Sequence, residues 1–297
     1  MAKDKKAVIG WIAVAITLLI ASLWAWWGIL ENFHEGWYSA SLLENLLMLF
    51  IQYLSFSIVF IILAIISIYY KKVGAALFIA LALFSVFFFN MDMTVILFIL
   101  PFLLMLGAGF YFGKINNKKL AIYLIIGIPV LIILGFGIPN LLKVGQRAND
   151  NNFGLRVIEG NGIALTWAPK GIGFPEEGTD WNKAGYNCLH LSEDGTRLED
   201  AEQNIWHLPT KEEIVRSLTR KDKNAGGTIN PQGKPEYRIQ PDKETPLWDP
   251  NSKIIYYWTS EEKDKNYSFM VSYNGQLLWR SKTSGAGYHG YRCVKEI

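Results

Sequence analysis

The sequence predicts a membrane bundle of five helices followed by an α+β domain. The chain is apolar in long runs up to about residue 142, and from residue 143 onward it is mixed, polar and rich in turns. About twenty apolar helical residues cross the roughly 30 Å hydrocarbon core of a bilayer, where the backbone must satisfy its own hydrogen bonds. The apolar runs are therefore predicted to be transmembrane helices.

Five runs are long enough to span the membrane: residues 7–30, 46–70, 73–90, 93–113 and 120–142. None of them carries the ionisable side chain that a transporter or proton relay usually places at mid-membrane depth. Gln52, Ser55 and Ser57 lie inside the second run, where hydrogen bonding between helices is the simplest role for them. Two alternatives stay open: a channel or transporter regulated by the outer domain, and a subunit of a membrane complex or homo-oligomer.

Lysines mark alternate connections between the runs: Lys3, Lys5 and Lys6, then Lys71 and Lys72, then Lys114, Lys118 and Lys119. Loops rich in lysine stay in the cytoplasm, which places the N-terminus inside. Five crossings then place residues 143–297 outside a bacterial plasma membrane, either in a periplasm or at the cell surface. This is the expected localisation, with the lipid bilayer as one partner.

The charge pattern argues against a nucleic-acid partner. Up to Arg147 the chain has ten Lys or Arg against five Asp or Glu, and the rest has nineteen against twenty-one. Phosphate binding needs a concentrated positive face, which the second half lacks. The net charge of +3 is mainly the lysine signal of the membrane half.

Residues 143–153 are predicted to be a polar linker and residues 154–297 an α+β domain. Asp180 is a predicted N-cap for a helix over 181–191, and Thr210 with Glu213 has the spacing of a capping box. Asn274-Gly275 suits a tight hairpin turn. Strands are expected, in a largely antiparallel sheet, over 155–159, 163–168, 254–259, 267–273, 276–281 and 291–295.

Three motifs in this half resemble those of a bacterial C-type-lectin-like family: Ile205-Trp-His-Leu-Pro-Thr-Lys-Glu-Glu-Ile214, Tyr256-Tyr-Trp-Thr-Ser260 and Gly290-Tyr-Arg-Cys-Val294. The family includes the C-terminal domain of a collagen-like adhesin, and its fold is similar to that of the formylglycine-generating enzyme. The resemblance covers about residues 155–297, and His207 departs from it because the family usually has arginine there. It implies a domain that binds a glycan, a peptide or a protein.

The resemblance also implies a disulfide between Cys188 and Cys293, because C-type-lectin-like folds commonly join a helix to the last strand. An oxidising compartment would let such a bond persist. Two free thiols, or a redox or copper-binding pair as in the related oxidase, are the alternatives. The chain has no nucleophile elbow, Walker loop, dinucleotide fingerprint or paired-carboxylate motif, so we expect a binding protein, with an enzyme related to the formylglycine-generating oxidases as the alternative.

The candidate ligand-binding residues lie in the long polar loop 220–251, and long ordered loops tend to be functional. Gln240-Pro241-Asp242 matches a triplet that calcium-dependent lectins use to hold a galactose-type sugar through Ca²⁺. Asp249 is a further candidate ligand, and Trp248 is the candidate stacking platform for a sugar. No cofactor other than Ca²⁺ is expected.

Overall fold

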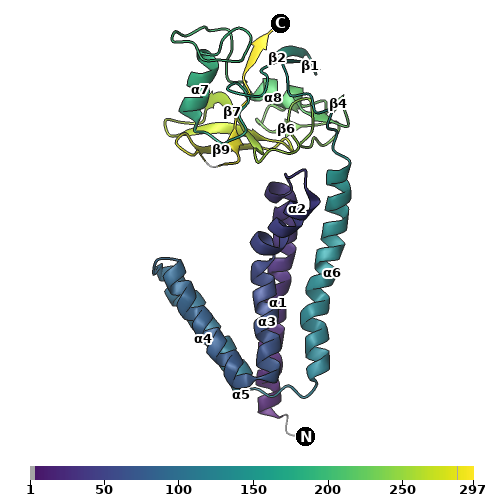
Figure 1. Ribbon diagram of the computed structural model, residues 1–297, viewed down its shortest axis with the longest axis vertical. Helices are drawn as coiled ribbons and strands as arrows, with labels where there is room; N and C mark the ends of the chain where they lie inside the picture. The colour runs from purple at the N-terminus through teal and green to yellow at the C-terminus, as the bar shows by residue number, and fades with distance from the viewer. Residues whose placement is uncertain (1–3, 286) are drawn as a thin grey trace. The chain divides into compact units, whose positions relative to one another are not determined.

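The computed structural model describes residues 4–285 and 287–297 (Figure 1). The chain divides into two compact units. The helical unit comprises the N-terminal segment up to Gly36 and Leu42–Leu142, and the C-terminal unit comprises Trp37–Ser41 and Lys143–Ile297. The first unit is made of long apolar helices, and the second is rich in β-strands.

From residue 4 onward, where the structure describes the helical unit, four helical stretches are long and apolar enough to cross a membrane, or five if a bent pair forms one span. They are α1 (Lys5–Glu31) with its extension η1 (Asn32–Gly36), α4 (Lys71–Phe88), η3 (Val95–Ile99) with α5 (Leu100–Phe112), and α6 (Lys118–Gly145). These helices coincide with four of the five predicted runs.

The remaining run, predicted as one span over 46–70, is broken. Its first part is α2 (Leu42–Met48) with η2 (Leu49–Tyr53), and this part meets α3 (Ser55–Tyr69) at a bend of 62°. The N–H of Leu54 bonds to the carbonyl of Leu49, five residues back, so the chain leaves the α-helical pattern at the bend. Gly28 of α1 lies against the carbonyl of Tyr53, just before the bend. A side chain at position 28 would collide with this carbonyl.

Small residues set the contact between α1 and α5. A Cβ on Gly10 would lie 2.6 Å from the carbonyl oxygen of Lys114, and Gly113 lies against Gly10 in the same way. The backbones are close enough for the N–H of Lys114 to donate to the carbonyl of Lys6 at 2.8 Å. Close backbone approach through small residues is typical of helices that pack in lipid.

Substituting Gly10 by alanine should therefore destabilise the helical unit by about 1–3 kcal/mol, because the added methyl forces the two backbones apart. Gly127→Ala is the matched control, since no atom lies within 4 Å of a Cβ at that position of α6. The measurement is the unfolding transition of the full chain in detergent. Equal effects of the two substitutions would contradict this account of the contact.

The described residues of the C-terminal unit form four separate sheets. The first is three-stranded, in the order β1 (Arg156–Gly160), β2 (Ile163–Trp167), β11 (Val294–Glu296). The second is four-stranded, in the order β10 (His289–Gly290), β7 (Tyr256–Glu262), β8 (Tyr267–Ser272), β9 (Leu277–Ser281). Two small ladders, β3 (Thr219–Arg220) with β4 (Lys223–Asn224) and β5 (Thr228–Ile229) with β6 (Pro235–Glu236), lie in the predicted loop 220–251. The pairing is antiparallel except between β10 and β7. Of the predicted last strand over 291–295, only Val294 and Lys295 are in a strand, β11, and β10 ends at Gly290, before the predicted range.

The helices α7 (Trp181–Leu189) and α8 (Lys211–Ser217) of this unit begin directly after the N-cap residues predicted from the sequence, Asp180 and Thr210. The side chain of Asp180 accepts a hydrogen bond from the N–H of Lys183 at the start of α7. At α8, the hydroxyl of Thr210 accepts from the Glu213 N–H while the Glu213 carboxylate accepts from the Thr210 N–H. The capping box is therefore confirmed.

The core of the unit is rich in aromatic side chains and contains a disulfide bond. Its largest fully buried side chains include Trp167, Phe174, Trp206, Tyr257, Trp258 and Tyr291. Cys188 on α7 is bonded to Cys293 just before β11, which confirms the expected pairing. The bond joins residues that are 105 positions apart in the sequence.

Replacing both cysteines by alanine should lower the free energy of unfolding by about 4–5 kcal/mol, because a loop of this length restricts the unfolded chain strongly in the chain-entropy model. Chemical unfolding of the full chain in detergent measures the change. Wild-type protein with a reductant should behave like the variant, and a loss on the order of 1 kcal/mol or less would contradict a major stabilising role.

Candidate functional site

The four predicted ligand-binding residues occupy different environments. Gln240 is exposed, and its amide donates to the carbonyl of Asn274. Asp242, Trp248 and Asp249 are buried. The structure therefore does not gather the four side chains at one open surface.

Asp242 is 0 % exposed and is enclosed by cationic side chains. Its Oδ1 accepts from Arg147, with the nearer nitrogen at 2.9 Å, and its Oδ2 accepts from Arg220 at 3.1 Å. The ammonium of Lys143 lies 3.9 Å from Oδ2. A buried carboxylate is stable only when it is paired and hydrogen-bonded, and here both oxygens have arginine partners.

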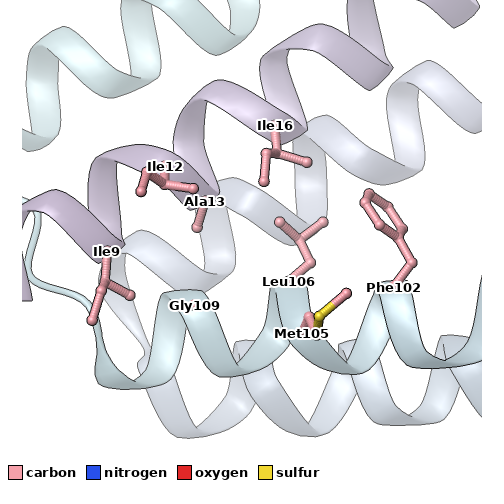
Figure 2. Close-up of a pocket in the computed structure, with 8 residues that line it drawn as sticks. All are labelled: Ile9, Ile12, Ala13, Ile16, Phe102, Met105, Leu106 and Gly109. Atoms are coloured by element: carbon pink, nitrogen blue, oxygen red, sulfur yellow. The ribbon is translucent and has the colours of Figure 1, made fainter.

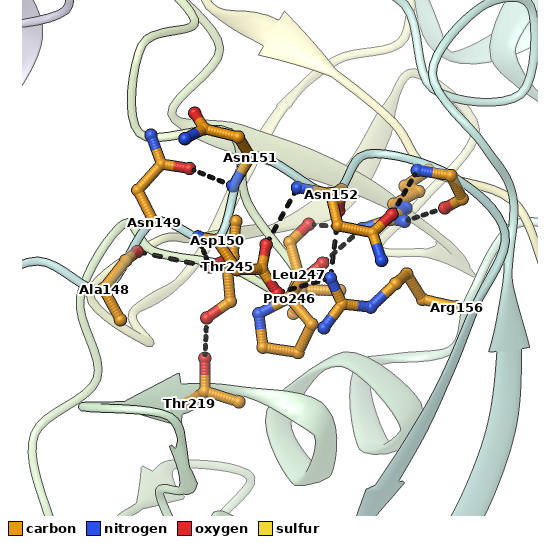
Figure 3. Close-up of polar contacts among 12 residues, drawn as sticks. Ala148, Asn149, Asp150, Asn151, Asn152, Arg156, Thr219, Thr245, Pro246 and Leu247 are labelled. Atoms are coloured by element: carbon orange, nitrogen blue, oxygen red, sulfur yellow. Dashed lines mark hydrogen bonds and ion pairs between the residues drawn. The ribbon is translucent and has the colours of Figure 1, made fainter.

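Residues 143–153, predicted as a linker, are attached to the C-terminal unit. Lys143 to Gly145 form the last turn of α6, and the segment after them lies beside residues 244–247 (Figure 3). The N–H of Ala148 donates to Glu244 at 3.1 Å, and the N–H of Asp150 donates to the Thr245 hydroxyl at 3.1 Å. The attachment could not be predicted from the sequence. The segment is polar and has no periodicity, as in a linker, and its partners lie 95 or more positions away.

Lys243 is buried inside the same cluster. Its ammonium donates to the carbonyl of Ser252. Burial and, to a smaller extent, the charge of Arg147 lower the pKa of Lys243 from 10.5 to about 7, although Asp249 and Asp242 act in the opposite direction. Lys243 is therefore partly uncharged near neutral pH.

Trp248 belongs to the core. Its ring stacks on Tyr257 with a centroid distance of 3.7 Å and an interplanar angle of 10°. The neighbouring carbonyls of Pro246 and Leu247 accept from the buried guanidinium of Arg292 at 2.6 and 3.0 Å. A sugar has no access to the Trp248 ring in this arrangement.

The calcium hypothesis gains no support from this geometry. Ca²⁺ takes six to eight oxygen ligands. Within the described residues, no group of three or more His, Cys, Asp or Glu side chains is arranged to hold a metal ion. The oxygens of Asp242 are already bonded to arginines.

An open polar pocket does exist beside Asp249. It has a volume of about 290 Å³, close to the lower end of the range for small-molecule sites. Its lining residues, all in the C-terminal unit, are Tyr38, Lys170, Glu176, Glu177, Asp249, Asn251, Ser252 and Lys253.

Lys170 organises the charges of this pocket. Its ammonium lies 2.7 Å from Glu176 and 3.0 Å from Asp249. Burial opposes the charge on Lys170, but the hydrogen bonds to the two carboxylates outweigh it and raise the pKa of Lys170. Three carboxylates and two ammonium groups thus surround the opening, an arrangement suited to a ligand with hydroxyl or amino donors.

An exposed aromatic pair forms a second surface on the four-stranded sheet. Trp279 on β9 is 45 % exposed and meets Tyr267 on β8 edge-to-face at 5.2 Å. The ammonium of Lys263 lies 3.2 Å from the centre of a Trp279 ring. Because a cation already covers one face of this tryptophan, the pocket beside Asp249 is the better candidate site.

Sequence reasoning found Asp249 but missed its partners. The backbone of Gly171 and Phe174 is bonded in both directions, which forms a tight turn between Lys170 and Glu176. The Gly- and Pro-rich segment 169–175 was the available signal for this turn. Nothing local in the sequence links Lys170 to Asp249, which lies 79 residues further along the chain.

Together these features define a protein with long apolar helices and a disulfide-bonded, β-rich unit that carries a small polar pocket. No protein-family model, curated protein or solved structure matches the chain.

Raising the pH should stabilise the wild type relative to a Lys243→Met variant. The lysine pKa is about 7 when folded and near 10.5 when unfolded, so between these values the unfolded chain binds more protons. Folding stability of the wild type should therefore rise relative to the variant between pH 7 and 10, by at most about 1.4 kcal/mol per pH unit, and the difference should be constant below pH 6.

Denaturant unfolding of the full chain in detergent at several pH values measures this difference. Lys234→Met is the control, since Lys234 is exposed. A wild-type stability that follows the Lys243→Met curve at a constant offset from pH 6 to 10 would show that Lys243 does not titrate as described.

Proposed function

We propose that the protein is a membrane-anchored recognition protein. In this proposal the apolar helices cross a bacterial plasma membrane with the N-terminus in the cytoplasm. The C-terminal unit is a C-type-lectin-like domain that faces a periplasm or the surroundings and binds a glycan, a peptide or a protein.

Three observations support the membrane placement. The helical unit has four to five stretches of sufficient length and apolarity, and its lysines fall in alternate connections. The Cys188–Cys293 disulfide fits an oxidising compartment outside the cytoplasm. These features agree with one another but come from different parts of the chain.

The binding role rests on the polar pocket beside Asp249. Lys170 pairs with both Glu176 and Asp249, and Glu177 and Lys253 add further charges at the opening. Carboxylates accept hydrogen bonds from the hydroxyl groups of a sugar or from the amino group of a peptide. The small volume suits one residue of such a ligand.

The C-type-lectin-like assignment is supported by the positions of the motif residues. Trp206 and Trp258, from the first two motifs, are fully buried, and Arg292 and Cys293 of the third motif tie the core together. His207, the residue that departs from the family pattern, lies with its Nε2 3.2 Å from Glu213 at the start of α8. These residues thus act in folding and leave the ligand to other positions.

Transport receives less support. Four buried hydroxyls of the helical unit donate to helix carbonyls: Thr17 to Ala13, Ser57 to Ala21, Ser67 to Leu63 and Ser85 to Ala82. The bond of Ser57 joins α3 to α1, as expected for interhelical hydrogen bonding. Groups that are already bonded to the backbone serve packing better than they serve a substrate path.

The test is a glycan and peptide array with the full chain in detergent, run with Ca²⁺ and with chelator. For a ligand found there, Glu176→Gln combined with Glu177→Gln should weaken binding by about tenfold or more, because hydrogen bonds to charged groups contribute about 1.5–3 kcal/mol. Glu202→Gln is the control, since Glu202 is also exposed but does not line the pocket. Unchanged binding by the double variant would remove the pocket from the proposal.

A further inference from the structure

The helical unit contains an apolar groove between α1 and α5 (Figure 2). Its volume is about 290 Å³. On α1 it is lined by Ile9, Ile12, Ala13 and Ile16, and on α5 by Phe102, Met105, Leu106 and Gly109. Both sets follow the spacing of one helix face, so the groove runs along the two helices.

The groove results from the sequence of small and large residues along this contact. A Cβ on Gly109 would lie 3.1 Å from the Cβ of Ala13, so these two positions bring the helices close. Larger side chains project outward on either side, and Ile12 and Met105 are 52 % and 65 % exposed. Two turns of each helix thus form a hollow with an apolar lining that is open to the outside of the unit.

One end of the groove is positively charged. Lys5 and Lys6 precede Ile9 by four and three residues, which places them on the same face of α1. Lys114 follows α5 directly, and its N–H is bonded to the carbonyl of Lys6. These three side chains are exposed, and the acidic residue beside them is Asp4, 3.8 Å from the Lys114 ammonium.

We propose that this groove is a binding site for an anionic phospholipid. One acyl chain lies between α1 and α5, and the phosphate lies at Lys5, Lys6 and Lys114. Basic groups at the end of an apolar cleft between membrane helices have the charge that an anionic headgroup requires. The site follows from the placement of the helices in a membrane and is independent of any ligand of the C-terminal unit.

A second copy of the chain is the competing occupant. Residues 9–16 rise only about 10 Å along the helix axis, whereas a spanning helix extends over about 30 Å of hydrocarbon. A flexible acyl chain fills so short a hollow more readily than a rigid helix does. The three lysines also favour an anionic headgroup over a copy of the same basic surface.

The proposal is tested with the full chain in detergent, titrated with phosphatidylglycerol or phosphatidylcholine, with bound lipid counted by native mass spectrometry. We expect one phosphatidylglycerol to bind more tightly than phosphatidylcholine. Lys5→Gln with Lys6→Gln should weaken phosphatidylglycerol binding by roughly fivefold for each lysine and leave phosphatidylcholine unchanged. Lys72→Gln with Lys119→Gln, which removes two exposed lysines at the starts of α4 and α6, outside the two helices that line the groove, should change neither.

A second pair of variants tests the apolar part. Ile12→Trp fills the groove from an exposed position and should abolish the bound phosphatidylglycerol, whereas Leu83→Trp on α4, at the same 52 % exposure, should not. Equal binding of the two lipids by the wild type, or retention of the lipid by Ile12→Trp, would overturn the proposal. A dimer that dissociates in Ile12→Trp would overturn it in favour of a second copy.

Discussion

The buried guanidinium of Arg292 is the constraint on which the C-terminal unit depends. Its nitrogens donate to the carbonyls of Ala168, Gly154, Pro246 and Leu247, so one side chain joins the first hairpin, the long loop and the end of the chain. Burial lowers the pKa of Arg292 to about 10, yet the group stays charged at neutral pH. A buried cation needs hydrogen-bond acceptors around it, so the backbone has to bring these carbonyls together. The same arrangement places the neighbouring Cys293 for its bond to Cys188 on α7.

The long loop 220–251 has an unusual composition for a folded interior. Asp242, Lys243 and Glu244 are consecutive, ionisable and buried, and Arg147 and Arg220 enclose them. Replacing such networks by apolar residues often preserves stability, so the ion pairs are weak evidence that this cluster stabilises the fold. The cluster fixes where the segment after α6 joins the C-terminal unit. The pairs of Arg147 with Asp242 and of the Ala148 N–H with Glu244 make this connection.

Local features of the fold were predictable, and long-range ones were not. The caps at Asp180 and Thr210 and the turn at Gly275, with its φ of +83°, follow from residues within four positions of one another. The disulfide came from family resemblance and not from spacing. The pairing of β10 and β11 with strands of two different sheets and the burial of Asp242 depend on partners far away in the sequence. Periodicity carries no information about such partners, so the sequence could not show that Asp242 and Trp248 belong to the interior while Asp249 lines an open pocket.

The disulfide also determines how this unit responds to proteolysis. Cys188 and Cys293 enclose most of the domain, including the exposed turn at 231–234 between β5 and β6. Exposed turns of this kind are preferred cleavage sites. A single cut there opens the chain without releasing a fragment, since both products remain covalently linked. The nicked protein would keep its whole C-terminal unit linked to the rest of the chain until a reductant separated the pieces.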